Sequence, residues 1–216
     1  MSPRPITSLD EHAIAWSCSE AERAGRALVV FLHGYGGHES DWAPWLPALP
    51  AGAVGAALRG PVAVDQRWAW VDFAARGSTA ASGVAALSAC ARGVLAWVDR
   101  QDAQRVALVG WSQGGALAVH LLRQRPQRFA SAALVAGFVW DRRPHAGIRA
   151  RRPPVWYGMG ARDDVITPAM AAASRRWLAE HTDARVVDFP GETHMLSHAF
   201  ADGALRFTAD VLTATD

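Results

Sequence analysis

A serine lies between glycines where a predicted strand meets a predicted helix. Ser112 is the centre of a Gly-x-Ser-x-Gly motif at 110–114, which follows the apolar run 106–109 and opens a helical segment. The two outer glycines permit a turn so tight that side chains there would collide with the neighbouring strand and helix. This context is typical of a nucleophile elbow, which presents the serine Oγ at the end of a sheet. Ser112 could instead be a helix N-cap, a role that serine also fills, but the strand before it and the helix after it favour the nucleophile.

A glycine-rich loop follows another predicted strand. Residues 33–37 read His-Gly-Tyr-Gly-Gly and come directly after the apolar run 28–32. Such a loop can direct a backbone N–H toward an oxyanion, and the N-terminus of the helix after the serine can supply a second. We therefore predict the backbone N–H groups of Tyr35 and Gln113 as the two donors of an oxyanion hole. Taken alone, a loop with three glycines is more typical of a flexible turn, and His33 is predicted to pack or hydrogen-bond rather than to act as a base.

Carboxylates and a histidine follow two further predicted strands. Asp163 and Asp164 come after the apolar run 155–159, where a carboxylate can orient a histidine and stabilise its imidazolium. Either aspartate could instead serve as a turn residue or a helix cap. His194 follows the next predicted strand and a Pro-Gly turn, so it lies on a loop where an imidazole can act as general base. His198, four residues on and near the last predicted helix, is a weaker candidate.

These candidates depend on an alternation of apolar strands and longer helical segments. Strands are predicted over 13–17, 28–33, 55–58, 105–110, 132–137, 155–159 and 185–189. Helices are predicted over 82–100, 112–125, 168–181 and 200–212. Near-continuous apolar strands that alternate with helices predict an α/β fold with a mostly parallel sheet covered on both faces. Because ligands bind beyond the carboxyl ends of such strands, all the candidates should meet at that end of the sheet, which we call its carboxyl edge. The opposite end, where the strands begin, is the amino edge.

The composition is that of an ordinary globular protein. The chain has 216 residues, of which 50% are hydrophobic, and we expect one domain over 1–216. A net charge of +2 is too small to indicate a nucleic-acid partner. All 22 basic residues are arginine, which excludes chemistry that needs a lysine Schiff base. Cys18 and Cys90 are too few and too far apart for a disulfide framework.

The sequence carries no clear targeting or membrane signal. Its first residues lack the continuous apolar core of a signal peptide. No uninterrupted apolar stretch reaches the about 18 residues of a membrane span. We therefore expect a cytoplasmic protein without stable membrane anchoring, as a monomer or a homodimer.

Tryptophan and arginine are concentrated near the predicted active edge. There are 10 tryptophans, and Trp42, Trp70 and Trp111 are predicted to line an apolar substrate pocket. Ordinary core packing is the alternative for each of them. Five arginines between 142 and 152 follow a predicted strand. They either meet an anionic head group near the mouth of the site or form a solvated loop, as runs of charge usually do.

The motifs together resemble the small carboxylesterase/phospholipase group of α/β-hydrolases, which includes acyl-protein thioesterases and bacterial lysophospholipase-like esterases. The resemblance is carried by FLHGYGG at 31–37 with Trp42, LRGP at 58–61, WAWVDF at 68–73, GWSQGGALAVHLL at 110–122, GARDDVITP at 160–168 and PGETHML at 190–196. The chain order of Ser112, Asp163 and His194 is also the order of an α/β-hydrolase triad.

The resemblance implies an α/β-hydrolase fold with helices on both faces of the sheet, a minimal lid, and neither metal nor organic cofactor. It implies a Ser112–Asp163–His194 triad, because in the family the aspartate comes three residues after the strand-end glycine. Thr167 before Pro168 departs from the family's pattern and leaves Asp164 as a second candidate. The implied activity is hydrolysis of short- to medium-chain carboxylic esters through an acyl-enzyme. An acyl-thioesterase, a lysophospholipase, or a non-catalytic binding protein on the same fold are the alternatives.

Overall fold

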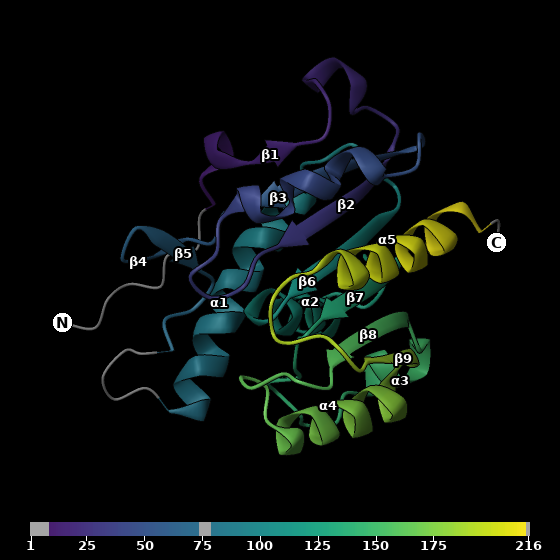
Figure 1. Ribbon diagram of the computed structural model, residues 1–216. Helices are drawn as coiled ribbons and strands as arrows, with labels where there is room; N and C mark the ends of the chain where they lie inside the picture. The colour runs from purple at the N-terminus through teal and green to yellow at the C-terminus, as the bar shows by residue number, and fades with distance from the viewer. Residues whose placement is uncertain (1–8, 74–78, 215–216) are drawn as a thin grey trace.

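Seven strands form the central sheet of the computed structural model, which describes residues 9–73 and 79–214. Their order across the sheet is β1-β3-β2-β6-β7-β8-β9 (Figure 1). The strands are β1 (Ala15–Trp16), β2 (Ala27–Leu32), β3 (Ala53–Leu58), β6 (Val106–Trp111), β7 (Ser131–Val135), β8 (Pro154–Gly160) and β9 (Asp183–Phe189). β1 pairs antiparallel with β3, and the other neighbours are parallel. The predicted mostly parallel sheet is confirmed.

Helices cover both faces of the sheet (Figure 1). One face packs against α1 (Ala80–Val98), α2 (Gln113–Gln124), α3 (Ala146–Arg151) and α4 (Pro168–His181). The other face packs against the 3₁₀ segment η3 (Glu39–Ala48) and α5 (His198–Thr213). The shorter elements are η1 (Glu11–Ala13), η2 (Glu20–Glu22) and a separate hairpin of β4 (Val62–Val64) and β5 (Arg67–Ala69). The result is the three-layer architecture of an α/β fold.

The residues of β2 show why its sequence is continuously apolar. Leu28, Val30 and Leu32 belong to the hydrophobic cluster on one face of the sheet. Val29 and Phe31, which point the other way, belong to the cluster on the opposite face. All five are almost completely buried. A parallel strand covered on both faces therefore has no position at which a polar residue would meet water.

Helix α1 combines a core position with an unusually apolar composition. By length and hydropathy alone, residues Ala81–Val98 could cross a membrane, although they are not an uninterrupted apolar run. In the fold, 50% of this window is buried inside the protein. Leu87, Val94 and Val98 pack in the same cluster as the sheet, so its apolar face is used as a core helix uses it.

Several short or irregular elements of the fold were not predicted from the sequence, among them η1, η2, η3, the β4–β5 hairpin and α3. The segment η3 contains Pro44 and Pro47, which remove backbone donors and break helical periodicity. The β4–β5 hairpin consists of three-residue strands, and α3 spans six residues, too short for a periodic pattern to emerge. In the opposite sense, the predicted strand 13–17 contains only the two residues of β1.

Candidate active site

The turn at Ser112 has a backbone conformation that serine rarely adopts. Its φ is 54° and its ψ is −115°, in a region that costs a non-glycine residue about 1–3 kcal/mol. Its N–H donates to the Val135 carbonyl of β7 at 2.9 Å, which holds the turn against the sheet. A Cβ at Gly110 would lie 2.3 Å from the Gly114 oxygen, and one at Gly114 would lie 2.2 Å from the Leu32 oxygen. Both glycines are thus required by close backbone contact.

Three side chains from the ends of β6, β8 and β9 meet at this turn. His194 Nε2 lies 2.9 Å from Ser112 Oγ, and His194 Nδ1 lies 2.8 Å from Asp163 Oδ2. The Asp163 side chain is 2% exposed. Its other oxygen accepts hydrogen bonds from the backbone N–H groups of Val165 and Ile166 at 2.9 and 2.8 Å. The carboxylate is therefore fixed on one side by the backbone and oriented on the other toward the imidazole.

The two alternative candidates lie elsewhere. Asp164 is exposed, whereas its neighbour Asp163 faces the imidazole. His198 is the first residue of α5 and its ring packs edge-on against Trp45 with centroids 5.3 Å apart. The structure thus brings Asp163 and His194 to Ser112, and directs Asp164 and His198 away from it.

The glycine-rich loop after β2 forms a tight turn. The Gly37 N–H donates to the Gly34 carbonyl at 3.1 Å, which makes Tyr35 and Gly36 the two central residues. Gly36 has a φ of +67°, which suits the third position of a type II turn and favours glycine. This turn places the Tyr35 backbone beyond the end of β2, the strand adjacent to β6 in the sheet.

His33 anchors that loop as a neutral side chain. Its Nδ1 lies 2.7 Å from the Gly34 carbonyl, and its Nε2 accepts from the Gly60 N–H at 2.9 Å. The proton is therefore on Nδ1, and the ring stacks on Trp70 with centroids 4.9 Å apart. Burial lowers the pKa of His33 to about 4. The ring is thus a fixed part of the loop's support, in the hydrogen-bonding position predicted for it.

Gln113 contributes more than its backbone. As the first residue of α2, it has an N–H without an intrahelical acceptor. Its buried side chain also accepts from the Trp70 N–H at 2.8 Å and donates to the Val71 carbonyl at 2.7 Å. The residue after Ser112 therefore ties the segment after β5 to the site. Sequence reasoning missed this role, for which the only signal is the glutamine within the Gly-x-Ser-Gln motif.

The three tryptophans predicted to line a pocket occupy different environments. Trp42 and Trp70 are buried, and their indole N–H groups donate to the carbonyls of Leu32 at 3.3 Å and His33 at 2.8 Å. Both side chains lie in the core, not on an open wall. Trp111 is half-buried and donates to the His194 carbonyl at 2.9 Å. It therefore holds the histidine loop against the turn at Ser112.

An aromatic cluster, defined as Tyr35, Phe73, Phe138 and Trp140, lies on loops at the same edge. Phe73 contacts each of the other three rings, with centroids 5.6, 6.4 and 4.6 Å away in that order. Phe73 follows the Val71 segment held by Gln113. Sequence reasoning gave no role to Phe73, the last residue of the family motif at 68–73, or to Phe138, which directly follows the predicted strand 132–137.

Exposed apolar side chains also gather at this edge. Among the described residues, the large exposed hydrophobic side chains are Tyr35, Phe73, Val165, Val186 and Met195. All except Val186 lie on loops after β2, β5, β8 and β9. We call these four residues the apolar rim. Apolar side chains that gather around a polar centre mark a binding surface.

The five arginines of 142–152 do not form one head-group site. Arg143, with Arg123 of α2, pairs with Asp141, and the Arg143 hydrogen bond lowers the pKa of Asp141 to about 2. Arg151 and Arg152 come directly before β8, at the amino ends of the strands and so opposite Ser112. The interpretation as a group at the mouth of the site is wrong for these two, because α3 returns the chain to the other edge.

No group of three or more His, Cys, Asp or Glu side chains in the described ranges is placed to hold a metal ion.

Comparisons with known proteins agree with the fold. Residues 27–200 match the alpha/beta hydrolase fold family. This match runs from β2 into α5 and includes Ser112, Asp163 and His194. The chain belongs to that family, and the predicted fold class is confirmed.

Several solved structures share the fold. The Bacillus cereus carboxylesterase is 17% identical, with a TM-score of 0.74 over 92% of this chain and 93% of that one. Zea mays acyl-protein thioesterase 2 is 18% identical, with a TM-score of 0.71 over 92% and 98%. The phospholipase/carboxylesterase from Dyadobacter fermentans is 18% identical, with a TM-score of 0.69 over 98% and 100%. No curated protein sequence matches the chain significantly.

Proposed function

We propose that this protein is a serine hydrolase that cleaves carboxylic esters through an acyl-enzyme. The observation that carries the proposal is the continuous relay from Ser112 Oγ to His194 Nε2 at 2.9 Å and from His194 Nδ1 to Asp163 Oδ2 at 2.8 Å. A hydroxyl paired with an imidazole that a buried carboxylate orients is the arrangement that activates serine.

The acylation step follows from this relay. His194 Nε2 takes the proton of Ser112 Oγ while the oxygen attacks the ester carbonyl carbon. The carbonyl electron pair moves onto its oxygen, and Asp163 stabilises the imidazolium. The tetrahedral intermediate then collapses, the bond to the leaving alcohol breaks, and the alcohol takes the proton from Nε2.

Water then hydrolyses the acyl-enzyme, with His194 acting first as the base and then as the acid. His194 accepts a proton from water, whose oxygen attacks the acyl carbon. Collapse of the second intermediate breaks the bond to Ser112 Oγ, which recovers its proton from Nε2, and the carboxylate product leaves. The strained Ser112 backbone supports both steps, because it holds Oγ toward the imidazole before substrate binds.

We assign the oxyanion to the backbone N–H groups of Tyr35 and Gln113. The Gln113 N–H is the first of α2, where the helix dipole favours negative charge. Tyr35 is a central residue of the turn after the adjacent strand β2. In sites of this kind, each donor lowers the barrier by about 3 kcal/mol.

The substrate class is inferred from the surroundings of Ser112. The loops after β2 and β7 flank the turn after β6, and they carry three members of the aromatic cluster. Together with the apolar rim, they offer an apolar surface to an acyl chain. We therefore propose esters with short to medium acyl chains. Acyl thioesters and lysophospholipids would form the same acyl-enzyme and are compared with esters in the assay.

The test combines covalent labelling with turnover. The wild-type protein should react with a fluorophosphonate probe at Ser112 and hydrolyse p-nitrophenyl esters. Ser112→Ala should lose the label and essentially all turnover, while Ser40→Ala, at an exposed serine in η3, should keep both. The same variants are then assayed with acyl-thioester and lysophospholipid substrates. Near-normal turnover by Ser112→Ala, or no label on the wild type, would overturn the proposal; the latter favours a binding protein.

A further inference from the structure

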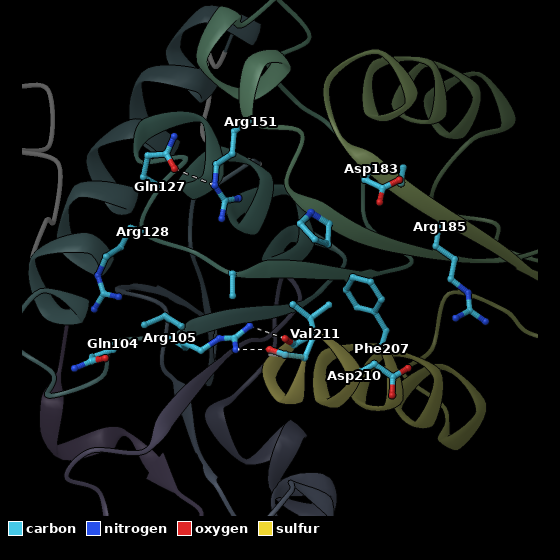
Figure 2. A pocket seen from close by; sticks show the side chains of 15 residues that line it. Gln104, Arg105, Gln127, Arg128, Arg151, Asp183, Arg185, Phe207, Asp210 and Val211 are labelled. Atoms are coloured by element: carbon cyan, nitrogen blue, oxygen red, sulfur yellow. Dashed lines mark hydrogen bonds between the residues drawn. The ribbon is translucent and has the colours of Figure 1, made fainter. Parts of the chain in front are cut away.

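A concave site lies at the opposite end of the strands from Ser112, at the amino edge of the sheet. It is a cleft of about 780 Å³ at the amino ends of β6, β7, β8 and β9, bounded by the last turns of α5 (Figure 2). Its volume falls within the range of small-molecule sites, about 300–1,000 Å³. Four arginines line it, Arg105, Arg128, Arg151 and Arg185, against two carboxylates, Asp183 and Asp210.

We propose that this cleft binds an organic anion, a molecule with a carboxylate or phosphate head and a small apolar body. Arginine is the side chain best suited to these heads, because its planar fork can donate two parallel hydrogen bonds. The proposal does not depend on the chemistry at Ser112, since it concerns binding at the other end of the strands.

Arg151 is the main anchor of the proposed head-group site. Its side chain points from the end of α3 into the cleft (Figure 2). Its Nε donates to Gln127 Oε1 at 3.2 Å and its Nη1 is buried without a hydrogen-bond partner among the described residues, so Nη2, which is neither paired nor fully buried, is the donor open to a ligand. Burial also lowers the pKa of this guanidinium. A charged group that is partly desolvated and incompletely hydrogen-bonded gains from an anionic partner.

The other three arginines differ in how far their donors are already used. Arg128 donates to the Val98 and Ala103 carbonyls at 3.2 Å each, and its Nε lies 3.7 Å from Asp99 Oδ1, so it adds charge but few free donors. Arg185 has no side-chain hydrogen bond or ion pair in the part of the chain that the structure describes, so its donors are available. Arg105 donates to the carbonyls of Val211 at 2.7 Å and Ala214 at 2.8 Å. It thereby offsets the negative end of the α5 dipole, which would otherwise repel an anion in this cleft.

The two sides of the cleft differ in charge, which orients the ligand. Figure 2 shows Arg151 and Arg128 on one side, Asp183, Asp210 and Arg185 on the other, and Phe207 between them. On their side the two carboxylates outweigh the single charge of Arg185, so the anionic head belongs beside Arg151 and Arg185 attracts it more weakly from across the cleft. The apolar body then lies along Phe207, with Pro154 and Val211 as further apolar lining.

Isothermal titration calorimetry tests the proposal with three probes: octyl phosphate, octanoate and inorganic phosphate. Octyl phosphate and octanoate distinguish a phosphate head from a carboxylate head, and inorganic phosphate tests the apolar body. Arg151→Gln should weaken binding of the preferred octyl probe by about 10- to 100-fold, the loss expected for charge-assisted hydrogen bonds. Arg185→Gln, at an exposed position, should weaken it by about 2- to 5-fold.

The matched control is Arg149→Gln, which removes an arginine from the same helix α3 that pairs with Glu180 outside the cleft. It should bind as the wild type does. Ser112→Ala should also bind as the wild type does, because the cleft lies at the other end of the strands; this variant checks that a carboxylate probe is not bound at the proposed active site instead. Thermal unfolding checks that each variant is folded. If Arg151→Gln does not fold, the binding measured for Arg185→Gln still tests the proposal.

The outcomes separate this proposal from the proposed function. Absence of saturable binding, or equal loss in Arg149→Gln and Arg151→Gln, would overturn the anion site while leaving the esterase assay untouched. Loss of binding in Ser112→Ala alone would also overturn it, because the anion would then occupy the other edge. If inorganic phosphate binds as tightly as octyl phosphate, the claim that the ligand has an apolar body is overturned.

Discussion

The carboxyl and amino edges of the sheet differ in how they present polar groups. At the carboxyl edge, Ser112, Asp163 and His194 form a short hydrogen-bonded relay with apolar side chains around it. At the amino edge, arginines from segments at the starts of several strands line an open cleft. The first edge depends on exact placement of a few atoms by backbone contacts, whereas the second depends on accumulated charge. A parallel sheet supports both, because all its loops of one kind gather at one edge.

Of the four non-glycine residues with positive φ in the described ranges, two lie at the carboxyl edge, Arg152 with φ of 48° lies at the amino edge, and Asp65 lies in the β4–β5 hairpin. Ser112, with φ of 54°, and Ala136, with φ of 44°, come directly after the neighbouring strands β6 and β7. Both are tied to the next strand, since their N–H groups donate to the Val135 and Gly158 carbonyls at 2.9 and 2.8 Å. At Ser112 and Ala136, the unfavourable backbone conformation is therefore maintained by a hydrogen bond to the neighbouring strand. If the two edges are independent, a substitution at one edge should leave the property of the other edge unchanged.

The largest effect is expected from Asp163→Asn. Asparagine keeps an oxygen for the N–H groups of Val165 and Ile166 but presents a neutral amide to His194. The imidazolium loses its counter-charge, so kcat/KM for a p-nitrophenyl ester should fall by about 10³- to 10⁴-fold with the fold retained. Steady-state kinetics and a thermal unfolding curve measure the two effects.

Asp164→Asn is the matched control, because this neighbouring carboxylate is exposed. It should keep kcat/KM within about threefold, since surface changes of this kind have small effects. Arg151→Gln at the amino edge should also leave ester turnover unchanged. Loss of turnover in Asp164→Asn but not in Asp163→Asn would show that the other aspartate orients His194.

The next effect concerns stability at the carboxyl edge. A Cβ on Gly114 would lie 2.2 Å from the Leu32 oxygen and 2.7 Å from the His33 oxygen. Both obstacles are backbone, so β2 and α2 must separate, and Gly114→Ala should destabilise the protein by about 1–3 kcal/mol or more. Urea unfolding measures this loss. At Gly52 nothing lies within 4 Å, so Gly52→Ala should change stability by less than about 1 kcal/mol. Equal losses would contradict the close contact.

Much of the carboxyl edge could be predicted from the sequence because its signals are local. A strand followed by Gly-x-Ser-x-Gly and a helix defines the turn at Ser112, and strand-end positions brought Asp163 and His194 into the same prediction. The preference for Asp163 over Asp164 came from a family spacing. The structure gives the physical distinction, because the two backbone donors, Val165 and Ile166, bind the first carboxylate.

The features that could not be predicted from the sequence depend on contacts between segments that are far apart in the chain. Trp42 and Trp70 resembled pocket residues because they occur on predicted loops, but their indole N–H groups reach buried carbonyls of the β2 end. The cleft at the amino edge assembles residues from four strand starts and the end of α5. Arg105 and Arg185 are 80 positions apart, and no local pattern places them together.

A further effect on stability is expected from pH. Burial lowers the pKa of His33 and of His120 to about 4, whereas an unfolded histidine titrates near 6.5. Between these values the unfolded chain binds more protons, so the free energy of unfolding falls as the pH falls. The loss should be on the order of 2 kcal/mol per histidine between pH 7 and pH 5. The arginines of the amino edge stay charged throughout and contribute nothing to it.

His120→Gln isolates one of the two histidines without disturbing the loop that His33 supports. His120 Nε2 lies 2.8 Å from Ser88 Oγ, and glutamine also offers a donor there. Urea unfolding at pH 7 and pH 5 should show a difference smaller by about half in the variant. The same difference in both proteins would mean that His120 does not change its protonation on unfolding in this range.

The smallest effect concerns the acyl chain and Phe73. This ring is the centre of the aromatic cluster and belongs to the apolar rim. If the acyl chain packs there, Phe73→Ala should lower kcat/KM for p-nitrophenyl octanoate about 10-fold more than for p-nitrophenyl acetate, because one lost apolar contact surface is worth about 1–2 kcal/mol. Val186→Ala, at an exposed apolar position on β9 outside the rim, should leave the ratio unchanged. An unchanged ratio in Phe73→Ala would place the acyl chain elsewhere and leave the cluster with a packing role.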